Sequence, residues 1–126
     1  MKPEQILVVD DEQRIVDSIA KCLTGEGFRV FCANDGLQAL AMFETRKYDL
    51  VLMDLSMPGM DGFSVIRHIR DEQKNSNIRI LVVSALADQQ LDHAIAIGAD
   101  AVLSKPFSNT QLRKTISEWV HPTVGI

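Results

Sequence analysis

The chain has 126 residues, a length typical of one domain with a single core. An apolar content of 46% argues against intrinsic disorder, and a net charge of −4 argues against broad attraction to nucleic acid or membrane surfaces. No stretch approaches the ~20 apolar residues that a membrane-spanning helix needs. We therefore expect one domain over residues 1–126, without a membrane segment and without direct contact to nucleic acid.

The start of the chain does not resemble a signal peptide, because it is polar and is followed by only a short apolar run. Cys22 and Cys32 match no metal-binding spacing and no redox motif. Both observations predict a cytoplasmic protein in a reducing compartment.

Strand-like and helix-like patterns alternate along the whole chain. In order, the expected elements are a strand at residues 5–9, a helix at 12–25, a strand at 28–32, a helix at 36–45, a strand at 49–53, a helix from 61 or 62, a strand at 78–83, a helix at 88–97, a strand at 101–103 and a helix from 108 or 109. We expect residues 121–126 to be a short tail or the stub of a linker.

This alternation predicts a doubly wound α/β fold. Successive strand–helix–strand units have right-handed crossovers, which give a parallel sheet with helices on both faces. Apolar spacing further predicts inward-facing residues in the second and fourth helices, namely Leu37, Leu40 and Ala41, and Leu91, Ala94 and Ile95.

Four of the apolar runs stop on a short polar group. These endings are Asp10 with Asp11, then Asp54, then Ser84, and finally Ser104 with Lys105. In an open α/β sheet, ligands bind beyond the carboxyl ends of the strands, so these side chains are expected to meet at one edge.

The residue types at this edge suit phosphoryl chemistry assisted by a divalent cation. Three carboxylates offer the hard oxygen ligands that Mg²⁺ prefers, and a carboxylate can also hold a phosphoryl group as an aspartyl phosphate. Lys105 supplies a positive charge for phosphoryl oxygens, and Ser84 supplies a hydrogen-bond donor.

Over residues 6–120 the chain resembles the receiver domains of two-component response regulators. The motifs that carry the resemblance are Val8-Val9-Asp10-Asp11-Glu12, the stretch from Asp54 to Gly62 (DLSMPGMDG), Val83-Ser84-Ala85, Gly98-Ala99-Asp100 and Lys105-Pro106-Phe107. Each motif is weak alone, but their order on successive strands is highly specific.

The resemblance implies a five-stranded parallel sheet in the flavodoxin-like order 2-1-3-4-5. It also implies that Asp54 is the phosphoacceptor and that Asp10, Asp11 and Asp54 bind Mg²⁺ together with the main-chain carbonyl of Ser56. Ser84 would be the switch hydroxyl of the family. Lys105 would be the lysine of the family motif, joined to Pro106 by a cis peptide bond.

The function implied is that of a signalling domain rather than an enzyme with a separate substrate. A histidine kinase or a phosphotransfer protein would donate the phosphoryl group to Asp54 in the presence of Mg²⁺. The domain would then change conformation to control a partner or an output domain, through the face formed by residues 88–97, residues 101–103 and the last helix.

Two positions depart from the usual family pattern. Receivers usually carry Tyr or Phe three residues before the lysine, where this chain has Val102, so coupling of the switch hydroxyl to a ring is not expected in its usual form. Leu86, two residues after Ser84, cannot orient a water by hydrogen bonding, which predicts a phosphoryl lifetime longer than in the fastest members.

Three other functions compete with this interpretation. A phosphatase of the haloacid dehalogenase type would need a second aspartate where the chain has Ser56. A flavin or nucleotide binder would need a Gly- or Ser/Thr-rich phosphate loop where the chain has the acidic residues 10–12. A degenerate receiver used only for protein contact is disfavoured by Asp11, Asp54 and Lys105, although Val102 keeps it open.

Overall fold

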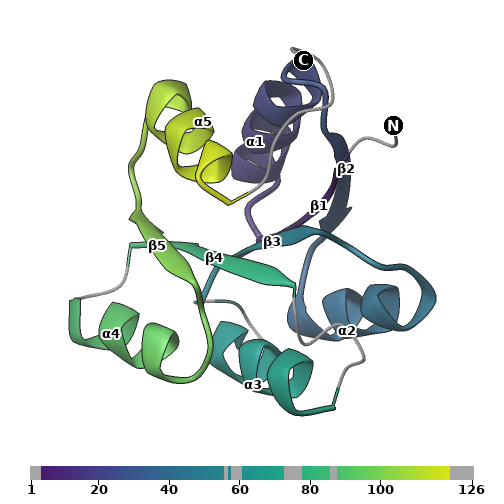
Figure 1. The fold of residues 1–126 in the computed structure, drawn as a ribbon, viewed down its shortest axis with the longest axis vertical. Coiled ribbons are helices and arrows are strands. Elements are labelled where there is room, and N and C mark those ends of the chain that lie inside the picture. The colour runs from purple at the N-terminus through teal and green to yellow at the C-terminus, as the bar shows by residue number, and fades with distance from the viewer. Residues whose placement is uncertain (1–3, 56, 58–60, 73–77, 86–87, 120–126) are drawn as a thin grey trace.

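The structure is a computed structural model that describes residues 4–55, 57, 61–72, 78–85 and 88–119. Its five parallel strands form one sheet in the order β2-β1-β3-β4-β5 (Figure 1). The expected fold class and strand order are therefore confirmed. In the described part of the chain, no helix is both long and apolar enough to cross a membrane.

Ten elements alternate along the chain: β1 (Gln5–Val9), α1 (Gln13–Gly25), β2 (Arg29–Ala33), α2 (Gly36–Thr45), β3 (Leu50–Met53), α3 (Gly62–Glu72), β4 (Arg79–Ser84), α4 (Asp88–Ala96), β5 (Ala101–Ser104) and α5 (Asn109–Ser117). Most predicted boundaries agree within one residue. Ser84 and Ser104 are the last residues of β4 and β5 rather than the first residues after them.

Helices cover both faces of the sheet, with α1 and α5 on one face and α2, α3 and α4 on the other (Figure 1). Alternate residues of a strand point to opposite faces, so Leu7 and Val9 pack on the α2–α4 side, while Ile6 and Val8 pack on the α1–α5 side. All four are buried. This two-sided burial explains why the strands read as continuous apolar runs.

The predicted inward faces of α2 and α4 are wrong in part. Leu37 is 65% exposed and Ile95 is 43% exposed. On α2, the buried face is formed by Ala39, Leu40 and Phe43, and Ala41 is exposed. The Phe43 ring packs against Tyr48 with centroids 5.4 Å apart, which turns the apolar face of α2 away from Leu37.

Candidate functional site

The sheet fixes the main chain of the two aspartates that follow β1 and β3. Val9 and Met53 are register partners in the parallel ladder. The ladder continues one residue further, because the Asp54 amide donates to the Val9 carbonyl at 3.0 Å and the Asp10 amide donates to the Ala33 carbonyl at 3.2 Å. Asp10 and Asp54 are therefore held side by side at the carboxyl edge of the sheet.

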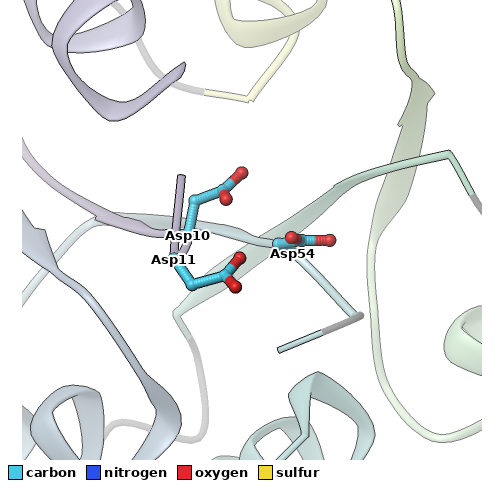
Figure 2. A group of neighbouring side chains, drawn as sticks. All are labelled: Asp10, Asp11 and Asp54. Atoms are coloured by element: carbon cyan, nitrogen blue, oxygen red, sulfur yellow. The ribbon is translucent and has the colours of Figure 1, made fainter. Parts of the chain in front are cut away.

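Three carboxylates gather at this edge (Figure 2). Asp10, Asp11 and Asp54 each offer an oxygen, and these oxygens lie within 4.8 Å of one another. Asp10 is fully buried and Asp54 nearly so, whereas Asp11 is exposed. The Glu12 amide donates to Asp10 Oδ1 at 2.9 Å and fixes that carboxylate. The cluster thus has a rigid interior and an open side facing solvent.

Lys105 reaches into the cluster from the segment after β5. Its Nζ lies 2.8 Å from Asp10 Oδ2 and 3.6 Å from Asp54 Oδ2. Its main-chain amide donates to the Ser84 carbonyl at 3.0 Å, and the Lys105–Pro106 bond is cis, as the resemblance implied. The predicted convergence of Lys105 with the three carboxylates is confirmed.

The surroundings keep Lys105 charged. Burial of the ammonium acts to lower its pKa, but the hydrogen bond to Asp10 and the charges of Asp54, Asp10 and Glu12 outweigh this effect. The pKa of Lys105 is therefore raised above its ordinary value of 10.5. At neutral pH the site therefore holds a positive charge beside Asp54.

Ser84 ends β4, the strand next to β3, and is buried beside the register partner Ser104 of β5. It thus lies on the same edge as the aspartates, as expected. Ser56 and Leu86 lie outside the described residues. Val102 is half-buried and packs against the core on the α2–α4 side of the sheet.

The charges at this edge do not cancel. Three carboxylates face one ammonium, and two unit charges about 4 Å apart repel by roughly 4 kcal/mol at an effective dielectric near 20. A divalent cation would offset this excess. Hard oxygen ligands with an open side fit Mg²⁺, which binds to few carboxylates, keeps several waters and accepts a phosphate as a further ligand.

Two features of this region were missed at the sequence level. A pocket of about 530 Å³ adjoins Lys105, with walls from α1 and from the segment after β5, including Arg14, Ile15 and Phe107. In addition, Gly62 lies against the main chain of Asp54 and Leu55. The pocket has no local sequence signal, because it depends on how separate segments pack. Gly62 ends the motif DLSMPGMDG, but the motif does not show that this residue packs against the main chain of Asp54.

Comparisons with known proteins agree with this geometry. Residues 6–117 match the family model described as the response regulator receiver domain. The sensory transduction protein RegX3 of Mycolicibacterium smegmatis is 37% identical over 109 residues, which are 85% of this chain and 46% of RegX3. The chain thus spans about half the length of that relative.

Solved structures show the same fold. Chemotaxis protein CheY4 of Vibrio cholerae superimposes with a TM-score of 0.89 at 28% identity, over 94% of this chain and 100% of CheY4. Response regulator TrrA of Thermotoga maritima, in complex with Mg²⁺-BeF, superimposes with a TM-score of 0.83 at 32% identity, over 93% of this chain and 99% of TrrA.

Proposed function

Because the chain belongs to the response regulator receiver domain family, a family of phosphorylation-activated signalling modules, we propose that Asp54 accepts the activating phosphoryl group. The observation that carries this proposal is the position of the Asp54 carboxylate, in a cluster with two further carboxylates and 3.6 Å from the Lys105 ammonium. No other described group of three potential metal ligands comes together in this way.

Mg²⁺ is the cofactor that this acidic site takes. Asp10, Asp11 and Asp54 would hold it, together with the main-chain carbonyl of Ser56, which lies outside the described residues. When bound, Mg²⁺ offsets the carboxylate charge and that of the phosphoryl oxygens.

The residues of the chain then have separate tasks. An oxygen of Asp54 attacks phosphorus, the bond from phosphorus to the donor's imidazole nitrogen breaks, and the electron pair stays on that nitrogen. Lys105 places a fixed charge for the transferred oxygens, and Ser84 donates a hydrogen bond to one of them after transfer.

Acetyl phosphate tests the acceptor directly. Wild-type protein incubated with Mg²⁺ and acetyl phosphate should gain one phosphoryl group by mass spectrometry, and Asp54→Asn should gain none. Asp49→Asn is the matched control, because this exposed acid precedes β3 at the opposite edge of the sheet. Equal labelling of wild type and Asp54→Asn would exclude Asp54 as the acceptor.

The competing functions fit the chain less well. The family match covers most of the chain and disfavours a separate phosphatase or a nucleotide binder. The acidic cluster itself argues against use for protein contact alone, since the three carboxylates and Lys105 are assembled around one space.

The donor is proposed to be a histidine kinase or a phosphotransfer protein acting in the cytoplasm. The pocket beside Lys105 supports this, because the half-buried Ile15 and Phe107 and the exposed Arg14 line it together with Lys105. Ile15→Glu should therefore slow transfer from phosphorylated kinases of the source organism while leaving labelling by acetyl phosphate unchanged. A parallel loss with both donors would argue against the pocket as the donor contact.

The output face is proposed to be α4, β5 and α5. Beryllofluoride, a phosphoryl mimic, should shift the backbone amide signals of these elements in NMR spectra of the wild type but not of Asp54→Asn. Shifts confined to residues around the acidic cluster would contradict this choice. Val102 has no aromatic ring that could move. The change in the amide signals of β5 is therefore expected to arise from the β5 main chain and from the neighbouring Ser84.

A slow loss of the phosphoryl group is also proposed. Leu86 offers no hydrogen bond to an attacking water, whereas a glutamate there would. Leu86→Glu should shorten the lifetime of the phosphorylated protein, followed by mass spectrometry after removal of acetyl phosphate. An unchanged decay rate would remove position 86 from the control of lifetime.

A further inference from the structure

The first residue of α3 lies against the main chain that carries Asp54. Gly62 is buried, and its amide donates to the carbonyl of Leu55 at 3.3 Å. The preceding residue, Asp61, accepts a hydrogen bond from the Ser64 amide at 2.9 Å and so caps the start of the helix. The amino end of α3 is thereby held close to the end of β3.

No side chain fits between these two segments. A Cβ atom added at Gly62 would lie 2.4 Å from the carbonyl oxygen of Asp54 and 2.7 Å from the Cα atom of Leu55. A Cβ atom essentially never lies within 3.0 Å of another heavy atom, so both approaches are severe clashes. Both of the atoms met belong to the main chain, so no change of side-chain rotamer can relieve them.

Neither segment can move independently of the sheet. On the helix side, Val65, Ile66 and Ile69 of α3 are fully buried in the core. On the strand side, the Asp54 amide is bonded to the Val9 carbonyl, and Leu55 is buried. A side chain at position 62 would therefore displace the main chain at Asp54, which sets where its carboxylate lies relative to Asp10.

We propose that Gly62 is a positioning residue for the phosphorylation site. By having no side chain, it lets α3 hold the Asp54 carboxylate within the 4.8 Å cluster that it forms with Asp10 and Asp11. This inference rests on the proposed function of Asp54. It adds the requirement that the start of α3 packs closely against the end of β3.

The test separates positioning from stability. Gly62→Ala should weaken Mg²⁺ binding about 10-fold or more, as loss of a group that orients metal ligands typically does, and it should slow labelling by acetyl phosphate. Mg²⁺ affinity is measured by NMR titration of the folded protein. Gly25→Ala is the glycine control, since a Cβ there meets nothing within 4 Å.

Ile69→Val is the stability control, because it removes a methyl group from the buried face of α3 without touching the acidic cluster. It should lower the free energy of unfolding while keeping the wild-type Mg²⁺ affinity. Should Gly62→Ala unfold, trimethylamine N-oxide restores the folded state, and all four proteins are then compared in it. The proposal is overturned if folded Gly62→Ala binds Mg²⁺ as tightly as the Gly25→Ala control, without the roughly 10-fold loss typical of disturbed ligand orientation.

The two proposals can fail separately. If wild-type protein is labelled at a residue other than Asp54, the acceptor assignment is wrong, and the Mg²⁺ affinities still decide the role of Gly62. If Asp54 is labelled but Gly62→Ala has normal affinity and normal labelling, only the positioning role is lost.

Discussion

Lys105 places one ammonium between two buried carboxylates. Its Nζ is 2.8 Å from Asp10 and 3.6 Å from Asp54, and its side chain is 14% exposed. A charged group in this setting stabilises the fold mainly by preventing an uncompensated buried charge. Loss of Lys105 would leave the Asp10 and Asp54 carboxylates to repel each other.

Lys105→Gln should therefore lower the free energy of unfolding at pH 7 by about 1–3 kcal/mol. Because the pKa of Lys105 is raised in the folded state, its stabilising effect is fully present below the ordinary lysine pKa of 10.5 and is lost as the pH rises through the higher folded value. Urea unfolding of both proteins without Mg²⁺, from pH 7 to strongly alkaline pH, measures the difference. A difference that does not shrink at alkaline pH would show that Lys105 acts through packing rather than charge.

The residues of the acidic cluster could be predicted because each follows an apolar run directly. Parallel strands of similar length bring their ends to one edge, so Asp10, Asp54 and Lys105 meet even though they are far apart in the sequence. Gly62 could not be predicted in the same way. It ends the motif DLSMPGMDG, but its requirement comes from the distance between α3 and the end of β3, which the motif does not show.

At the scale of elements, Arg70 joins α3 to the amino ends of β4 and β5. Its Nη1 donates to the Ile78 carbonyl at 2.7 Å, and its Nε donates to the Gly98 carbonyl at 2.9 Å. Its Nη2 pairs with Asp100 at 2.9 Å, and Asp100 also accepts from the Ile80 amide at 2.7 Å. One planar guanidinium thus satisfies main-chain carbonyls of two connecting segments, a geometry that an ammonium cannot reproduce.

Arg70→Ala should destabilise the protein by about 2–3 kcal/mol, because partly buried carbonyls and Asp100 lose a charged donor. Arg70→Lys should recover only part of this loss, since lysine can reach one partner at a time. Arg67→Ala, an exposed arginine of the same helix, should change the free energy of unfolding by no more than about 0.5 kcal/mol. Urea unfolding compares the variants, and equal effects of Arg67→Ala and Arg70→Ala would refute the special role of Arg70.

The elements themselves were predicted better than their orientation. Strand positions follow from continuous apolar runs, which only two-sided burial explains. The buried face of α2 was assigned to Leu37, Leu40 and Ala41, but the aromatic contact between Phe43 and Tyr48 sets a different one. A helix as apolar as α2 has several possible faces, and only its tertiary partners select among them.

Across the whole molecule, the acidic cluster and the contacts of Arg70 lie at opposite ends of the strands. The acidic cluster is at the carboxyl ends of β1 and β3, and the Arg70 contacts are at the amino ends of β4 and β5. Substitutions that are far apart and share no partners act independently. The excess negative charge of the cluster should therefore lower the free energy of unfolding by an amount that does not depend on the contacts of Arg70. A bound cation should offset this loss.

This separation predicts how Mg²⁺ controls the stability of the whole chain. A ligand that binds only the folded state stabilises it by RT ln(1 + [L]/Kd), which is about 1.4 kcal/mol when Mg²⁺ is at tenfold its Kd. Asp11→Asn removes the exposed carboxylate, so without Mg²⁺ it should be as stable as wild type or more stable by up to about 1 kcal/mol. With Mg²⁺ the wild type should be the more stable protein, since Asp11→Asn has lost a carboxylate that binds the cation.

Thermal unfolding with Mg²⁺ or with NaCl at matched ionic strength measures both effects. Asp49→Asn should keep the wild-type response to Mg²⁺, because its carboxylate accepts from the Gln5 amide at the other edge of the sheet. Arg70→Ala should also keep that response while starting from a lower stability. Equal stabilisation of wild type and Asp11→Asn by Mg²⁺ would mean that the cation does not bind where the three carboxylates meet, and the proposed link between charge, metal and fold would be wrong.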